Sequence, residues 1–132
     1  MNVHEYQAAA ILSRYGVPVN RGEVATTPDE VAAIAGNFGG VVAVKSQVHT
    51  GGRGKAGGIA IAKNPDEARA AGERIIGMDI RGHTVNKVLV AAGAEIAKED
   101  YLGVGLDCPP CRFPQLWQSA RVPRRASSSP RR

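Results

Sequence analysis

The chain has 132 residues, the length of one modest domain, and a formal net charge of +5. This charge is unevenly distributed: six arginines and no acidic residue lie between Cys108 and Arg132, which leaves 11 basic against 12 acidic groups in residues 1–107. A body so close to neutral lacks the concentrated positive face that nucleic-acid binding requires. No apolar run approaches the ~20 residues of a membrane span, and the N-terminus lacks the pattern of a signal peptide, so we expect a cytoplasmic protein.

Three segments have the pattern of short helices. Apolar side chains recur at roughly helical spacing over residues 3–15. Thr27-Pro28-Asp29-Glu30 combines an N-cap, a proline at the first helical position and acids in the first turn, and Asn64-Pro65-Asp66-Glu67 repeats this chemistry. The last two helices are predicted to stop at Gly39 and Gly77.

Strand candidates alternate with these helices. VVAVK, residues 41–45, is a nearly continuous β-branched run that predicts a strand buried on both faces, and GGIAIA, residues 57–62, predicts its partner. GEVATT, residues 22–27, and the segments 85–92 and 96–107 are further candidates. Strands that alternate with helices predict a layered α/β (α+β) fold.

A glycine-rich loop joins the two paired strands. Lys45 ends the first strand, and five glycines surround Arg53 and Lys55 in the stretch VHTGGRGKAGG. Backbone N–H groups freed by glycine can wrap an oxyanion, and a lysine can reach the same phosphates. The spacing is not that of a Walker loop. From these residues alone, phosphate binding and a plain hairpin turn are equal alternatives.

The first 107 residues or so resemble the N-terminal part of the succinyl-CoA synthetase (succinate–CoA ligase) β subunit family, which is an ATP-grasp family. The similar stretches are NVHEYQAAAILSRYGVPV, VKSQVHTGGRGKAGG and AKEDYLG. The resemblance implies the N-terminal lobe of an ATP-grasp fold. It also implies a ligase that uses ATP or GTP with Mg²⁺ to interconvert succinate and succinyl-CoA in the citric acid cycle. The partner is an α subunit that carries the phosphohistidine and the CoA site.

The same resemblance implies a set of nucleotide-binding residues. Lys45 corresponds to a lysine that contacts the phosphates, and Gly52, Arg53 and Gly54 correspond to a flexible cover over the nucleotide. Glu99 corresponds to a linker glutamate that binds the nucleotide, with a backbone contact at Ala94. No catalytic residue is implied within this chain, and the metal ligands of the family lie beyond it.

Two positions near this set are interpreted differently. Ala91 stands where many family members have a glutamate, which leaves the choice between adenine and guanine open. His49 lies beside the glycine loop, but the phosphorylated histidine of the family belongs to the α subunit, so we interpret His49 as loop structure.

The composition changes abruptly after Asp107. Residues 108–132 are rich in Pro, Ser and Arg, a composition typical of disorder, and the Cys108–Cys111 pair has no second pair with which to bind zinc. We therefore expect a partial ATP-grasp domain over residues 1–107 and a tail that is not native family sequence, in a truncated or frame-shifted product that is inactive alone. Two alternatives are another acid–CoA ligase, such as a malate–CoA ligase β subunit, and a nucleic-acid-binding module that uses the loop and the basic tail.

Overall fold

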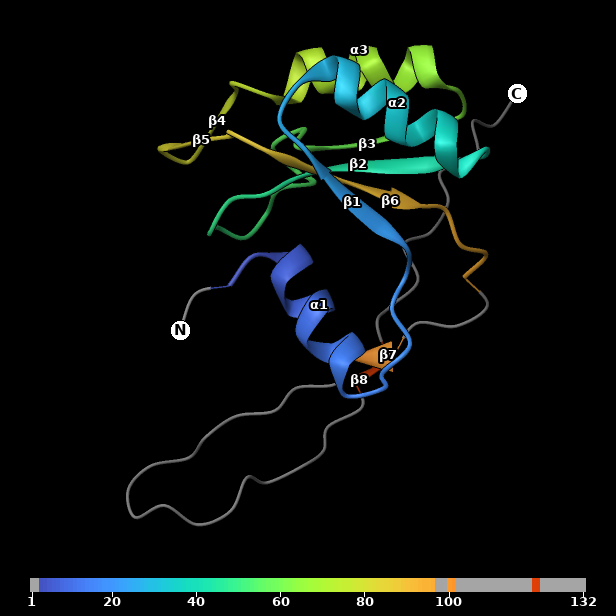
Figure 1. Cartoon of the computed structure of the whole chain (residues 1–132). Helices are drawn as coiled ribbons and strands as arrows, with labels where there is room; N and C mark the ends of the chain where they lie inside the picture. Colours follow the sequence, from blue (N-terminus) through green and yellow to red (C-terminus); the bar gives the residue numbers. More distant parts are fainter. Residues whose placement is uncertain (1–2, 97–99, 102–119, 122–132) are drawn as a thin grey trace, which may run out of the picture. The chain divides into compact units, whose positions relative to one another are not determined.

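A four-stranded antiparallel sheet carries the predicted phosphate lysine and the glycine loop (Figure 1). The computed structural model describes residues 3–96, 100–101 and 120–121. The chain divides into two units, Met1–Ala94 and Glu95–Arg132. The elements, in chain order, are α1 (Glu5–Arg14), β1 (Gly22–Ala25), α2 (Pro28–Phe38), β2 (Val42–Ser46), β3 (Ile59–Ala62), α3 (Pro65–Ile75), β4 (Asp79–Ile80), β5 (His83–Thr84), β6 (Val88–Ala92), β7 (Asp100–Tyr101) and β8 (Ala120–Arg121).

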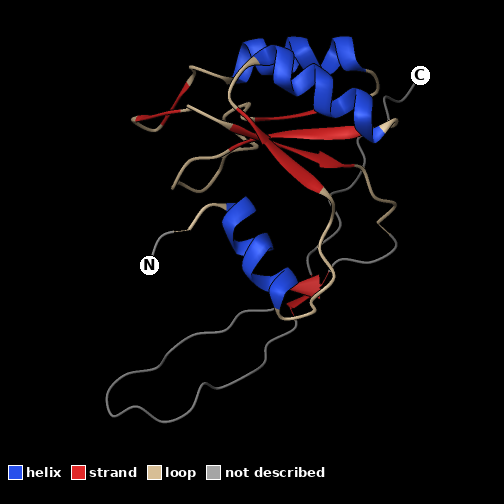
Figure 2. Ribbon diagram, viewed as in Figure 1, coloured by secondary structure: helices blue, strands red, loops and turns tan. Residues whose placement is uncertain are grey.

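The sheet order is β1-β6-β2-β3, so the last strand of the first unit lies in the middle of the sheet. Neighbouring strands are antiparallel, which makes β1 parallel to β2 with β6 between them, and β3 parallel to β6 with β2 between them. Helix α2 connects the first of these parallel pairs, and α3 lies in the connection of the second. Both helices cover one face of the sheet (Figure 2), and α1 lies on the other side. The α/β (α+β) prediction is therefore confirmed.

The core lies between the sheet and the helices α2 and α3. Its sheet side includes Val42, Val44, Val88 and Val90, and its helix side includes Val31, Ile34, Ala35, Ala68, Ala71 and Ile75. The interpretation of VVAVK as a strand buried on both faces is wrong, because burial alternates along β2. The two helices cover only one face, so Lys45 falls on the opposite face from Val44.

Capping chemistry fixes the ends of both core helices. Thr27 accepts a hydrogen bond from the backbone N–H of Glu30 at 3.2 Å, and Asn64 accepts one from that of Glu67 at 2.8 Å. Gly39 ends α2 in the left-handed conformation with φ 67°, which confirms the predicted glycine stop. These local signals were sufficient to place both helices.

A short hairpin of β4 and β5 was not predicted from the sequence. Its two-residue turn is Arg81-Gly82, with φ 55° and 80°, the pattern of a type I′ turn. The backbone N–H of Gly82 donates to Asp79 Oδ1 at 2.9 Å, which supports the turn. Arginine is an unusual residue here, since the left-handed region costs an L-residue about 1–2 kcal/mol.

The described residues after Ala94 are few. Residues 100–101 and 120–121 pair as β7 and β8, within the second unit. The predictions for the rest of the tail, including Cys108 and Cys111, lie outside the described residues. Among the residues that the structure describes, no helix is both long and apolar enough to cross a membrane.

A substitution at Gly58 tests how tightly the glycine loop packs against the sheet. A Cβ at this buried position would lie 2.5 Å from Ser46 Oγ and 2.6 Å from Ile80 Cδ1. We expect Gly58→Ala to lower the free energy of unfolding by about 1–3 kcal/mol, because the added methyl group overpacks the site. Urea unfolding followed by circular dichroism measures this change. The matched control is Gly40→Ala, where a Cβ meets nothing within 4 Å; equal losses in the two variants would contradict the prediction.

Candidate functional site

Lys45 points to the sheet face opposite the core helices. It is paired in register with Leu89 on β6 and Ile59 on β3, so it occupies the middle of that face. Its ammonium nitrogen lies 2.9 Å from Glu5 Oε1, and its side chain is 28% exposed. The lysine is therefore half-buried and already engaged with an anion.

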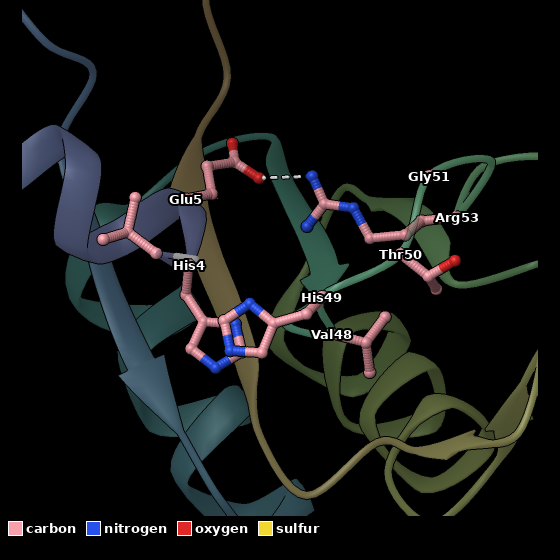
Figure 3. Close-up of a pocket in the computed structure, with 8 residues that line it drawn as sticks. His4, Glu5, Val48, His49, Thr50, Gly51 and Arg53 are labelled. Atoms are coloured by element: carbon pink, nitrogen blue, oxygen red, sulfur yellow. Dashed lines mark hydrogen bonds and ion pairs between the residues drawn. The ribbon is translucent and has the colours of Figure 1, made fainter. Parts of the chain in front are cut away.

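Arg53 reaches the same carboxylate from the glycine loop. Its Nη2 lies 3.0 Å from Glu5 Oε2 (Figure 3). Its Nη1 donates to the backbone carbonyl of Ser46 at 2.6 Å. The loop is held by its own backbone hydrogen bonds, among them Gly58 N–H to the Arg53 carbonyl at 2.8 Å and Ser46 N–H to the Gly58 carbonyl at 2.8 Å. The fold thus places the Arg53 guanidinium beside Lys45, although eight positions separate the two in sequence.

Glu5 joins the two cations, with one carboxylate oxygen facing each of them. Partial burial raises the pKa of this carboxyl group, but hydrogen bonds and charge from Lys45 and Arg53 outweigh burial, and the pKa lies below its ordinary value of 4.5. Sequence reasoning missed Glu5 as a site residue. An acid in the first turn of a helix has a sufficient local explanation in the helix dipole, and nothing local indicates a partner 40 residues away.

A pocket of about 550 Å³ opens beside this ion-pair cluster. Glu5 and Lys45 lie on its wall, and its remaining lining combines polar and apolar groups from α1, the segment before β1, the first residue of β1, and β6. These lining residues are Tyr6, Ala9, Ala10, Ser13, Val19, Asn20, Arg21, Gly22, Leu89 and Ala91. Its size falls within the ~300–1,000 Å³ range of small-molecule sites, and it offers a cationic end with an apolar surface next to it.

A second pocket of about 430 Å³ lies along the N-terminal end of α1 (Figure 3). His4 and His49 line it and their rings stack with centroids 3.9 Å apart, and Glu5 and Arg53 also line it. Desolvation, followed by the charges of His49, Lys87 and Arg53, lowers the pKa of His4 below 6.5. This lowered pKa favours the neutral form of His4, and Arg53 and Glu5 bring an ion pair to the same pocket.

The other residues implied by the resemblance have different positions. Gly52 and Gly54 belong to the loop, and Gly52 has φ 80°, a conformation that favours glycine. Ala94 is exposed and follows β6, outside the lining of both pockets described above. Glu99 lies outside the described residues. The structure therefore brings together Lys45 and Arg53 of the predicted set and adds Glu5.

Comparison with known proteins places this geometry in a family. A family model for the ATP-grasp domain matches residues 2–113, and the chain belongs to this family. Over 107 residues the chain is 60% identical to the ADP-forming succinate–CoA ligase subunit beta of Herpetosiphon aurantiacus and 58% identical to the GDP-forming succinate–CoA ligase subunit beta of Thermus thermophilus. These matches cover 81% of this chain and 28% of each relative. The resemblance to succinate–CoA ligase β subunits is thus confirmed, and the chain spans just over a quarter of the length of these relatives.

Solved structures agree on the fold. The chain matches the dinucleotide-forming acetyl-coenzyme A synthetase 1 of Ca. Korarchaeum cryptofilum in complex with coenzyme A, Ca-AMPCP and HgCl+, with a TM-score of 0.74 and 22% identity over 85% of this chain and 50% of that one. ACD1 of the same organism in complex with coenzyme A matches with a TM-score of 0.72 and 24% identity over the same shares. The predicted ATP-grasp fold is confirmed.

The lowered pKa of Glu5 predicts a pH-dependent contribution to stability. A carboxyl group whose pKa is lower in the folded state stabilises the fold above its unfolded pKa, and this contribution is lost as the pH falls through the folded pKa. We therefore expect Glu5→Gln to lower the free energy of unfolding at pH 7, by less than ~1 kcal/mol for each ion pair because the side chains are partly exposed. The difference from the unsubstituted chain should shrink as the pH falls below 4.5.

Urea unfolding at pH 7 and at pH 3 measures the difference in the free energy of unfolding between the unsubstituted chain and the Glu5→Gln variant at each pH. The control is the same comparison in a Lys45→Met background, where one of the two ion pairs is already missing and the pH dependence should be smaller. A difference between the unsubstituted chain and the Glu5→Gln variant that is independent of pH would contradict the assignment.

Proposed function

We propose that this chain binds the phosphates of ATP or GTP at Lys45 and Arg53, as the nucleotide-binding part of a succinate–CoA ligase β subunit. The observation that carries this proposal is the convergence of both cations on a single carboxylate, at 2.9 and 3.0 Å, beside a pocket of about 550 Å³. A phosphate group offers the same kind of anionic oxygen as Glu5, with more oxygens and more charge. Lysine supplies a compact charge, and arginine supplies a fork of N–H donors.

The neighbouring pocket supports a nucleoside next to those phosphates. Leu89 and Ala91 are almost fully buried and provide an apolar floor on the sheet, while Asn20 and Ser13 add polar groups at its edge. A purine needs such a combination of apolar surface and a few hydrogen-bonding groups. Because relatives are named both ADP-forming and GDP-forming, both nucleotides belong in the binding test.

The proposed activity also requires a metal ion, a partner subunit and further contacts to the nucleotide. Mg²⁺ is proposed to bind together with the nucleotide, with protein ligands that lie beyond this chain. Mg²⁺ supplies charge neutralisation during phosphoryl transfer. The proposed partner is an α subunit that carries the phosphohistidine. The proposed complex acts on succinate and CoA, in the citric acid cycle in the cytoplasm. Ala94 and Glu99 are proposed as further nucleotide contacts.

Lys45 provides the direct test. We expect Lys45→Ala to weaken the binding of ATP-Mg²⁺ or GTP-Mg²⁺ to the full chain by at least ~10-fold, because a charged hydrogen bond to phosphate is lost. Isothermal titration calorimetry measures the dissociation constants. Lys63→Ala is the matched control, because Lys63 is exposed and precedes α3 at the other end of β3. Unchanged nucleotide affinity in Lys45→Ala, or no binding by the unsubstituted chain, would overturn the proposal.

Glu5 provides a test with the opposite sign. Phosphate binding at Lys45 and Arg53 competes with the carboxylate that already occupies both cations. We therefore expect Glu5→Gln to tighten nucleotide binding, roughly three- to tenfold, since a charged competitor becomes a neutral one. Titration of the same nucleotides measures the change, and Glu73→Gln on α3 controls for the loss of one negative charge. Weaker binding in Glu5→Gln would mean that the carboxylate orients the cations and does not compete for them.

A further inference from the structure

Arg81 occupies a backbone position that arginine seldom takes. It is the only non-glycine residue with positive φ among the described residues, at the first position of the β4–β5 turn. Asn, Asp and Gly are the usual residues at this position of a type I′ turn. A residue that persists against the local backbone preference points to a role for its side chain.

The side chain of Arg81 lies against the glycine loop. A Cβ built on Gly52 would lie 3.2 Å from Arg81 Nη2 and 3.5 Å from its Cζ. Gly52 is therefore the residue that lets the guanidinium approach, and it directly precedes Arg53. The hairpin thus brings a further cationic group to the loop, from a segment that sequence reasoning did not identify.

The guanidinium of Arg81 is uncommitted, whereas that of Arg53 is engaged. Arg53 donates to the Ser46 carbonyl and to Glu5. Arg81 is exposed, and within the described part of the chain its side chain forms neither an ion pair nor a hydrogen bond. The nearest acid in its own turn, Asp79, instead accepts from the backbone N–H of Gly82. A free planar fork beside a glycine loop is suited to anionic oxygens.

We propose that Arg81 is a nucleotide-binding residue that contacts the phosphates of the nucleoside triphosphate from the hairpin side of the glycine loop. This inference rests on the proposed function and adds a residue to its site. Lys45 and Arg53 approach the phosphates from the sheet and from within the loop, and Arg81 approaches from β4–β5. The charge of the nucleotide then outweighs the cost of an arginine in the left-handed region.

The substitution Arg81→Asn separates a binding role from a structural one. Asparagine suits the turn better than arginine, so the melting temperature should stay the same or rise. The dissociation constant for ATP-Mg²⁺ should nevertheless increase about tenfold, because the charged contact is lost. AMP, which has a single phosphate, should lose less affinity than ATP. The variant Arg81→Lys keeps the positive charge but loses the planar fork of N–H donors. Its dissociation constant for ATP-Mg²⁺ should therefore lie between those of the unsubstituted chain and of Arg81→Asn.

The control is Arg74→Gln, which removes an exposed positive charge from α3, on the core side of the sheet, and should change ATP affinity by less than about twofold. Calorimetric titration of ATP-Mg²⁺ and AMP against the full chain and each variant, with thermal melts, provides all readouts. If Lys45→Ala loses binding while Arg81→Asn keeps the original affinity, the role of Arg81 is refuted and the proposed function stands. If the unsubstituted chain binds neither ATP nor GTP, the proposed function fails, and this inference fails with it.

Discussion

The ion pairs of Glu5 are the interaction on which the geometry of the site depends. No residue of α1, which the structure describes in full, is buried, so apolar packing contributes little to holding this helix on the sheet. Its carboxylate at Glu5, in contrast, contacts one cation from β2 and one from the glycine loop, both near 3 Å. Glu5 and Lys45 both line the pocket beside α1, so this ion pair forms part of its wall. An interaction between partly exposed charges is modest in energy, and therefore an incoming phosphate can compete with it.

Because side chains alternate along β2, one face of the sheet packs in the core and the other face carries the candidate site. Val42 and Val44 enter the core, and Ala43 and Lys45 face the other side. A shift of one residue in the register would bury the lysine under α2 and α3 and expose the valines. Such a shift is opposed by the fully buried valines of β2 and β6, which pair as Val44 with Val90. The packing of its neighbours thus fixes the face of the sheet on which the lysine lies, and its ion pair with Glu5 then positions the ammonium group.

Local chemistry made some of this structure predictable from sequence. The caps at Thr27 and Asn64 and the paired strands around the glycine loop follow from neighbouring residues, and the structure has them. The central place of β6 does not follow from local signals, because strand order depends on contacts distant in sequence. Glu5 was hidden by its ordinary place at a helix start. The β4–β5 hairpin was not predicted because the first residue of its turn is Arg81, whereas Asn or Gly is typical of that position.

The distribution of charge distinguishes the loop from the rest of the first unit. On the core helices, Arg69 faces two carboxylates, Asp29 at 2.7 Å and Glu73 at 3.4 Å, so the acids outnumber the cation. At the loop the ratio is reversed, since two cations share one carboxylate and Arg81 adds another positive group without an acid of its own among the described residues. An excess of positive charge held near a pocket lowers the stability of the folded chain through repulsion and attracts anions. A fold that keeps such an excess in one place, while acids outnumber the cation in the ion pairs of its core helices, has the electrostatic pattern of a site for a polyanion.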